Sequence, residues 1–133
     1  IMDYLNLSLD AESLESIAQI VENSDLVFWV CTPDVSQYFY ISPGYERVWG
    51  KTRASLVENP HSFLESVHPD DLERVTSATV GETAYNIDVE YRINRPDGVV
   101  KWVRDRTFPV KDKDGNIYRM VGIAEDITAR KQA

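Results

Sequence analysis

The single cysteine is the first residue in this sequence whose type could do chemistry. Cys31 ends the apolar run Leu-Val-Phe-Trp-Val-Cys, which begins at Leu26. A lone cysteine in such a run is typical of a small core or sheet residue rather than of a nucleophile. One cysteine also excludes a disulfide framework and fits a reducing compartment.

Two groups of acidic residues resemble reactive or metal-binding sites. Asp70, Asp71 and Glu73 follow a His-Pro pair and fall in the first turn of an expected helix, where the helix dipole favours negative charge. The stretch 112–116 (Asp-Lys-Asp-Gly-Asn) resembles part of a calcium loop, but Ile123 stands where an EF-hand needs a bidentate Glu. A hairpin turn explains it better. Without a nucleophile–base pair or a metal-ligand set, we do not expect an enzyme.

The charge distribution is uneven along the 133 residues. The net charge is −8, and residues 1–46 contain eight acidic residues and no Lys or Arg. Residues 92–119 contain eight basic residues against four acidic ones, a local net charge of +4. An acidic N-terminal third argues against nucleic-acid binding, a polybasic membrane anchor and a secretory signal. The longest apolar run is far below the roughly 20 residues of a membrane span. We expect a cytoplasmic location with no membrane segment in this chain.

Periodicity defines the first elements that position these residues. Leu14, Ile17, Ala18 and Val21 recur at helical spacing and predict an amphipathic helix over 11–23. Asp10 is its expected N-cap. Apolar and aromatic residues then predict strands over 26–31 and 38–41.

Short helices are expected to follow these two strands. Ser42-Pro43 is the expected cap and first position of a helix that stops at Gly50. Helical turns are expected around Leu56 and Phe63-Leu64. His68-Pro69 opens a further helix that ends near Gly81.

The second half of the chain changes to a period of two. Ile87, Val89, Tyr91 and Ile93 alternate with polar residues and predict a half-buried strand. Two Asp-Gly turns predict hairpins that join it to long strands over 99–110 and 117–127. A polar, helix-prone segment ends the chain. The order of elements indicates an α+β fold, with an antiparallel sheet and helices on one face.

Three segments in register resemble the PAS sensor-domain family in its common bacterial form with a PAC segment. They are YISPGYERVWG at 40–50, VHPDDLERV at 67–75, and the run from 89 to 133 that contains the Asp-Ile-Thr signature. The similarity covers about residues 13–131. It implies a five-stranded antiparallel sheet that encloses a pocket. It also implies a sensory or dimerisation module that regulates a linked effector and has no catalysis of its own.

The inner sheet face gives the candidate pocket residues. Alternation turns Ile87, Val89, Tyr91 and Ile93 toward the helices. Analogy with the family adds Val103, Asp105 and Thr107 from the long strand, and Met120, Gly122 and Ala124 from the last strand. These side chains either fill the core or line a ligand site, and the small Gly122 and Ala124 could leave room for a ligand. An inward Asp105 is costly unless it is paired or holds a polar ligand.

The cofactor is not named by the sequence. A photoactive flavin domain similar to the light-oxygen-voltage subfamily needs a Cys within Asn-Cys-Arg-Phe-Leu-Gln, whereas residues 62–66 here are Ser-Phe-Leu-Glu-Ser. Covalent flavin is therefore not expected. Haem is not expected either, because neither His61 nor His68 stands where an axial ligand is needed. Non-covalent flavin is left open, since Trp29, Trp49 and Trp102 could supply stacking surfaces.

The resemblance divides the chain and suggests how a signal leaves it. We expect an amphipathic helical cap over 1–24, a PAS core with PAC hairpins over 25–128, and the start of an exit helix over 129–133. Asp126 and Thr128 belong to the family motif where the last strand meets that helix. Thr128 is the expected N-cap, and Asp126 can accept hydrogen bonds or pair with a nearby Arg such as Arg130. The linked effector is expected to be a histidine kinase or a cyclic-dinucleotide enzyme such as a diguanylate cyclase.

The outward face of the long strand is part apolar and part cationic. Trp102 and Phe108 lie on it beside Arg104 and Arg106. We expect the helix over 11–23 to cover this face through Leu14, Ile17 and Val21, in its own subunit or in a partner of a homodimer. The alternative to a ligand sensor is a ligand-free interaction scaffold with a filled core.

Overall fold

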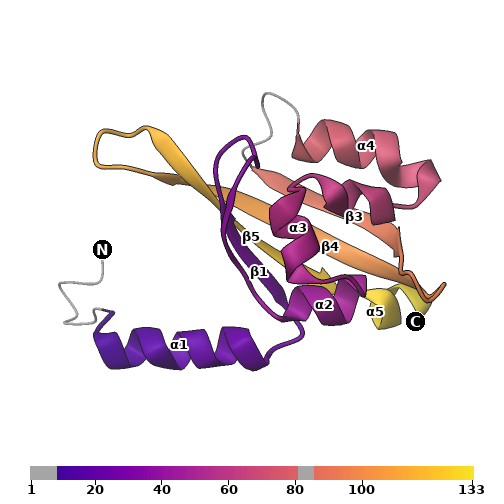
Figure 1. The fold of residues 1–133 in the computed structure, drawn as a ribbon, viewed down its shortest axis with the longest axis horizontal. Coiled ribbons are helices and arrows are strands. Elements are labelled where there is room, and N and C mark those ends of the chain that lie inside the picture. Colours follow the sequence, from indigo (N-terminus) through magenta and orange to yellow (C-terminus); the bar gives the residue numbers. More distant parts are fainter. Residues whose placement is uncertain (1–8, 81–85) are drawn as a thin grey trace.

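The computed structural model describes residues 9–80 and 86–133, and its framework is one antiparallel sheet (Figure 1). The spatial strand order is β2-β1-β5-β4-β3. All four neighbouring pairs are antiparallel. The first strand therefore pairs with both the second and the last, and the centre of the sheet joins the two halves of the chain. The five-stranded α+β arrangement expected from the sequence is confirmed.

The first half of the chain contributes one long helix, two short strands and a group of helices. Their bounds are α1 Ala11–Asn23, β1 Val27–Cys31, β2 Tyr38–Ile41, α2 Gly44–Trp49, α3 Arg53–Glu58, the 3₁₀ helix η2 Ser62–Ser66, and α4 Pro69–Thr79. The predicted end of the fourth helix near Gly81 and the beginning of the predicted N-terminal cap, 1–8, lie outside the described residues.

The second half is a three-stranded meander followed by a short helix. Its elements are β3 Ile87–Asn94, β4 Val100–Lys111, β5 Ile117–Asp126 and α5 Thr128–Gln132. Gly98 and Gly115 take positive φ in the two connecting turns, as the Asp-Gly pairs predict. In the second turn, Asp112 accepts hydrogen bonds from the amides of Asp114 and Asn116. These bonds support the hairpin interpretation of the calcium-like stretch.

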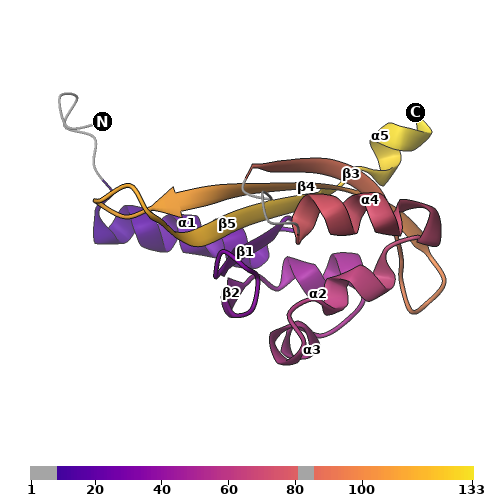
Figure 2. The ribbon, with the colours of Figure 1, turned by 90° about the horizontal axis from the view of Figure 1, so that it is seen from above.

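The helices α2, α3 and α4 form a layer on one face of the sheet, as Figure 2 shows. The core lies between this layer and the inner sheet face, and it contains Val75 of α4, Tyr91 and Ile93 of β3, Val103 of β4 and Ala124 of β5. Among the described residues, no comparable helix layer covers the opposite sheet face, which α5 contacts only near Trp102 and Glu90. Phe108 and Val121 remain exposed there.

Two contacts fix the helix layer on the sheet. Asp71, in the first turn of α4, accepts bonds from the backbone N and the guanidinium of Arg92 on β3. His68 caps the same helix by accepting a bond from the amide of Asp70. At the other end of the layer, a Cβ on Gly44 would lie 2.3 Å from the Leu26 carbonyl oxygen, so only glycine lets α2 approach β1 this closely.

One cap prediction was wrong. Ser42 does not cap α2 with its side chain, because Pro43 occupies the N-cap position and no side-chain cap bond forms there. The Ser42 hydroxyl instead accepts a bond from the Phe28 amide and donates one to the Leu26 carbonyl. It therefore joins the start of β1 to the chain beyond β2.

The N-terminal helix α1 forms where the periodicity predicts it, with Asp10 as its N-cap, but it does not cover the sheet of its own subunit. It contributes no buried residue, and Figure 1 shows it beside the sheet and separate from it. Leu14 and Ile17 expose 51% and 47% of their surface. Its C-terminal end is tethered by a bond from the Tyr40 hydroxyl to Glu22. Within the described residues, no helix is long and apolar enough to span a membrane.

Candidate functional site

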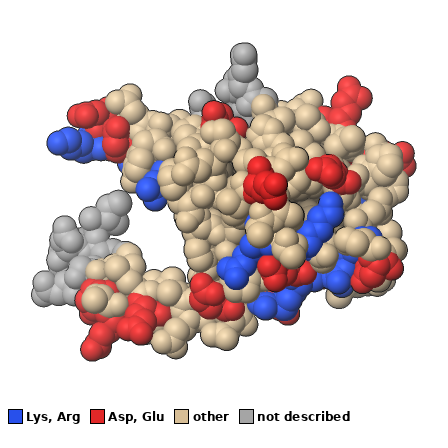
Figure 3. All heavy atoms as spheres, in the orientation of Figure 1, with Lys and Arg blue, Asp and Glu red and all other residues tan. Residues whose placement is uncertain are grey.

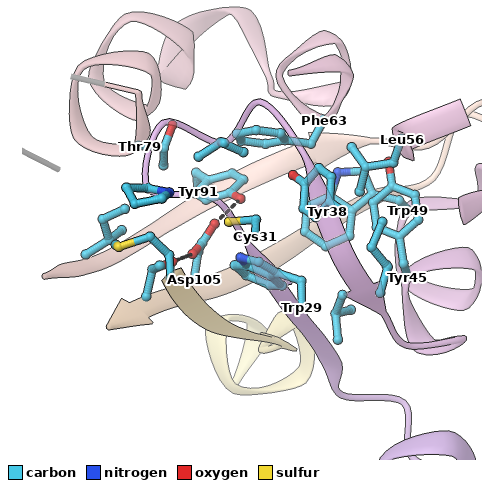
Figure 4. Close-up of a pocket in the computed structure, with 17 residues that line it drawn as sticks. Trp29, Cys31, Tyr38, Tyr45, Trp49, Leu56, Phe63, Thr79, Tyr91 and Asp105 are labelled. Carbon is cyan, nitrogen blue, oxygen red and sulfur yellow. Dashed lines mark hydrogen bonds between the residues drawn. The ribbon is translucent and has the colours of Figure 1, made fainter. Parts of the chain in front are cut away.

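A small cavity lies between the inner sheet face and the helix layer (Figure 4). About 50 Å³ of it is open to the centre of a water-sized sphere. This exceeds the roughly 10–15 Å³ that one ordered water requires. In this conformation the cavity therefore suits a few waters or a small molecule rather than a large cofactor.

Half of the predicted pocket residues line this cavity. They are Ile87, Tyr91, Asp105, Thr107 and Met120. Val89, Ile93, Val103 and Ala124 are buried on the same sheet face but pack into the core beside the cavity. The alternation of the strands therefore identified the correct face, but not the part of it that is hollow.

Gly122 has a different role from the one expected. The Trp29 indole occupies the space above it, and a Cβ on Gly122 would lie 2.0 Å from that ring. The absent side chain thus makes room for a tryptophan rather than for a ligand. β1 and β5 pair with Trp29 directly opposite Gly122, which explains the contact.

Of the three tryptophans expected as possible stacking surfaces, Trp29 and Trp49 line the cavity and Trp102 does not. The other walls supplied by the first half of the chain were not predicted from the sequence. From β1, β2 and the loop between them come Val27, Cys31, Pro33, Val35, Tyr38 and Ile41; from the helices come Tyr45, Leu56, Phe63 and Thr79. The alternation of Val27, Trp29 and Cys31 was a usable signal. These three side chains face inward because β1 pairs with β5. That pairing joins residues far apart in the sequence, so the local pattern alone does not predict it.

Of the cavity-lining residues that the structure describes, Asp105 is the one carboxylate. Its side chain accepts a bond of 2.9 Å from the Tyr91 hydroxyl and one of 3.2 Å from the Thr107 hydroxyl. Only 4% of its surface is exposed. Burial raises the pKa of Asp105 to about 6, although both hydroxyl donors act to lower it. The cost expected for an inward Asp105 is therefore met only in part by neutral donors.

The opposite end of the cavity carries two unpaired polar atoms. The rings of Tyr45 and Trp49 stack with centroids 5.3 Å apart. The Tyr45 hydroxyl and the Trp49 indole nitrogen are buried and have no hydrogen-bond partner among the described residues. Buried polar groups normally find a partner, so these two atoms are the free polar positions at that end of the cavity.

Cys31 also faces this cavity. Burial, together with the negative charges of Asp34 and Asp105, raises the pKa of its thiol to about 12. A thiol with that pKa is protonated at neutral pH and is a poor nucleophile. Cys31 thus acts as an apolar wall residue, in agreement with the interpretation from the sequence.

The exit motif forms a compact hydrogen-bonded turn. The Thr128 hydroxyl donates to Asp126 over 2.5 Å, and the Thr128 amide donates to the same oxygen over 2.9 Å. The Trp102 amide on β4 donates to the Thr128 hydroxyl over 2.9 Å. The turn therefore fastens the start of α5 to the long strand.

Two details of this motif were predicted incorrectly. Thr128 is the first residue of α5 rather than its N-cap, which is Ile127 and makes no side-chain cap bond. Asp126 pairs with Lys101 over 3.2 Å instead of with Arg130. Partial burial acts to raise the pKa of Asp126, but the bonds from Thr128 and the Lys101 ammonium outweigh it and lower that pKa.

The exit helix has a second attachment that the sequence did not reveal. Lys131 lies 4.6 Å from the centroid of the Trp102 ring and 2.7 Å from Glu90. Arg130 also pairs with Glu90, over 2.8 Å. These contacts connect α5 to the outer sheet face. They involve residues far apart in the sequence, with no local pattern to indicate them.

The two halves of the predicted cap interface, the apolar stripe of α1 and the outer face of β4, are not packed together in this structure. Leu14 and Ile17 of α1 are exposed and Val21 is half-buried, so this helix buries none of its apolar stripe against the sheet. Phe108 exposes 51% of its surface. On the same sheet face, the Arg106 Nε atom has no hydrogen-bond partner among the described residues.

A family model described as "PAS fold" matches residues 38–124. Among curated proteins, the uncharacterized protein y4lL of Sinorhizobium fredii is 30% identical over 92% of this chain and 15% of its own length. Sensor protein FixL of Bradyrhizobium diazoefficiens is 33% identical over 63% of this chain and 18% of its own length. The chain thus spans less than a fifth of either relative.

Solved structures give similar matches. A domain described as part of a light and redox sensing histidine kinase from Haloarcula marismortui has a TM-score of 0.64 and 34% identity, over 86% of this chain and 99% of that domain. The N-terminal domain of a diguanylate cyclase with a PAS/PAC sensor from Marinobacter aquaeolei has a TM-score of 0.68 and 25% identity. That match covers 80% of this chain and 98% of that domain.

Proposed function

The chain belongs to the PAS fold family, and we propose that it is a sensory module that binds a small ligand in the cavity and passes the change to an effector through the turn at Asp126 and Thr128. The similarity to sensor kinases and to a diguanylate cyclase supports a signalling role of this kind. A histidine kinase or a diguanylate cyclase is accordingly the proposed effector, joined at the C-terminal side.

The observation that carries this proposal is the position of the cavity relative to the exit turn. Met120 lines the cavity on β5, and the same strand ends at Asp126, which holds Thr128. Asp105 lies on β4, which also supplies the Trp102 amide to Thr128. A ligand that shifts β5 would thus act on α5 through Asp126, and one that shifts β4 would act on it through Trp102.

Ligand binding is tested by mass spectrometry of the 133-residue chain purified from cells. We expect a native mass that exceeds the denatured mass by one small molecule. An absorption spectrum of the same sample shows whether that molecule is a flavin or another chromophore. A native mass equal to the denatured mass, together with no uptake from a metabolite library, would contradict the sensor proposal.

That contrary result would favour a ligand-free interaction scaffold. The small cavity volume is the observation that supports this second candidate. Both candidates include a homodimer, because α1 and the outer sheet face each leave apolar side chains uncovered. We propose that α1 of one subunit covers the outer sheet face of the other.

A further inference from the structure

Asp105 is a buried carboxyl without a counter-charge. Of the residues that the structure describes, only Tyr91 and Thr107 bond to its side chain, and both are neutral hydroxyls. Each carboxylate oxygen can accept about two hydrogen bonds, so about half of the acceptor capacity of Asp105 is unused. Because Asp105 lines the cavity, that capacity is available to a ligand.

The other titratable groups near Asp105 do not supply a positive charge. Tyr91 of β3, Cys31 of β1 and Tyr38 of β2 face it, and burial raises the pKa of each of the three groups. All three are neutral at pH 7. From the helix layer, the cavity receives apolar and aromatic side chains, the hydroxyl of Tyr45 and that of Thr79. Among the described residues, an ionised Asp105 is therefore the only formal charge on the cavity wall.

The walls around this charge are aromatic. Trp29, Tyr38, Phe63 and Tyr91 all line the cavity, and Figure 4 shows Trp29 and Tyr91 on either side of Asp105. Faces of such rings attract a cation electrostatically, and most strongly when the cation is desolvated. The carboxylate is complementary to a positively charged group, and the surrounding rings are complementary to the apolar groups attached to that charge.

We propose that the cavity binds a small organic monocation, an ammonium compound whose N–H groups donate to Asp105 while its apolar part packs against the aromatic walls. This inference rests on the proposed function, since it names the class of ligand that the sensor takes. The free polar atoms of Tyr45 and Trp49 add a position for a hydrogen-bonding group at the far end of the ligand. A small apolar cation needs only the Asp105 end.

The test compares two probes of nearly equal shape, isobutylammonium and isobutanol. Both are titrated into the 133-residue chain at pH 7.5, with tryptophan fluorescence as the readout, because Trp29 and Trp49 line the cavity. We expect the ammonium probe to bind at least tenfold more tightly than the alcohol. In Asp105→Asn the ammonium affinity falls at least tenfold, and the alcohol affinity stays within about twofold.

A matched variant controls for the overall charge. Asp88→Asn removes one negative charge from the outer face of β3, where Asp88 pairs with Arg104. We expect it to bind both probes as the unmodified chain does. A second measurement needs no variant: between pH 7.5 and pH 5, where Asp105 gains a proton, the ammonium affinity should fall about tenfold.

Each contrary outcome has a distinct meaning. Equal binding of the two probes, or an ammonium affinity that is unchanged in Asp105→Asn and from pH 7.5 to 5, overturns the cation proposal but leaves ligand sensing intact. Failure of both probes to bind at 50 mM also overturns it. Native mass spectrometry then decides independently whether the cavity holds a ligand of another class, so the two proposals fail separately.

Discussion

At the scale of single residues, Asp105 combines burial with a raised pKa, and this has a consequence for stability. The folded chain binds a proton at Asp105 up to about pH 6, whereas a free Asp releases it near 3.8. Between these values the folded state holds more protons than the unfolded state, so the contribution of Asp105 to stability decreases as the pH rises. Ligand-free protein is therefore expected to be less stable at neutral pH because of this residue.

Asp105→Asn should remove the loss of stability that ionisation of Asp105 causes at neutral pH. We expect the variant to exceed the unmodified chain in unfolding free energy at pH 7.5 by on the order of 2 kcal/mol, and by much less at pH 4. Urea unfolding at both pH values measures the difference. Carboxylates whose pKa is lowered, such as Asp71 and Asp126, produce the opposite pH trend, but they are present in both proteins and cancel. A difference independent of pH would contradict this account.

Gly122 gives a second residue-scale prediction. Gly122→Ala places a methyl group where the Trp29 ring lies, so the indole must move into the cavity. We expect a loss of about 1–3 kcal/mol in unfolding free energy and a changed tryptophan emission. Gly98→Ala is the comparison: its added methyl group meets no atom within 4 Å, although its φ of +85° still adds backbone strain. Unchanged emission in Gly122→Ala would show that Trp29 does not occupy that space.

These residues show how far sequence reasoning reaches into the site. The inward position of Asp105 follows from strand alternation and family analogy, and the structure confirms it. Trp29 was expected as a possible stacking surface, but its position over Gly122 was not predicted, because it depends on pairing with β5, more than 90 residues later. Local patterns determine which way a side chain points, whereas distant pairing determines what it meets.

At the scale of elements, Asp71 holds α4 against β3. Its side chain is 8% exposed and accepts three bonds from Arg92. The side-chain bonds from Arg92 lower the pKa of Asp71 to about 2. We expect Asp71→Ala to lose about 2–4 kcal/mol, since an unpaired guanidinium and amide remain.

The neighbouring Asp70 provides the control for that measurement. It lies in the same first turn, but 77% of its side chain is exposed. Asp70→Ala should change the unfolding free energy by less than about 1 kcal/mol. Because the pKa of Asp71 is lowered, its stabilising contribution is present above about pH 4 and is lost as the pH falls toward 2. Equal losses for the two variants would indicate that the contact with Arg92 is unimportant.

The exit turn is the element whose disruption should affect signalling more than folding. Thr128→Ala removes the acceptor for the Trp102 amide and the donor to Asp126, while Thr128→Ser keeps both. In the full-length parent we expect Ala to uncouple effector activity from the ligand and Ser to preserve the coupling. The cost to domain stability is about 1 kcal/mol. Normal regulation in Thr128→Ala and in Asp126→Ala would refute the proposed route.

Element boundaries were largely predictable, as were the caps Asp10 and Gly50, but the caps expected at Ser42 and Thr128 were not found. Helical and strand periods placed α1, β2 and β3 within about one residue, because their patterns are long or sharply bounded. Thr128 has the right side chain for a cap and the right position in sequence, yet it lies one residue inside α5. The bond from the Trp102 amide, which belongs to another strand, draws its hydroxyl toward β4.

At the scale of the whole molecule, two surfaces with exposed apolar side chains are left uncovered by the described residues. Figure 3 shows Asp and Glu side chains concentrated on α1, which stands apart from the rest of the molecule. The outer sheet face carries the exposed Phe108 beside Arg104 and Arg106, which pair with Asp88 and Glu125 of the same sheet. Apolar side chains thus meet when α1 of one subunit lies on the sheet of another, and the arginines must be shared between the sheet carboxylates and those of α1. Exposed ion pairs contribute only about 0–1 kcal/mol each, so apolar burial must supply most of the affinity.

A charge placed in the apolar stripe of α1 tests this arrangement. Ile17→Glu should convert the dimer to a monomer, because a carboxylate would be buried against Phe108 and its neighbours without a partner. Gln19→Glu adds the same charge to α1 outside the stripe formed by Leu14, Ile17 and Val21, and should leave the dimer intact. Light scattering after size-exclusion chromatography gives the mass, and hence the oligomeric state, of each variant. A chain lacking 1–24 should be a monomer, like Ile17→Glu. A truncated chain that stays soluble and keeps the native oligomeric state would contradict the proposed role of α1.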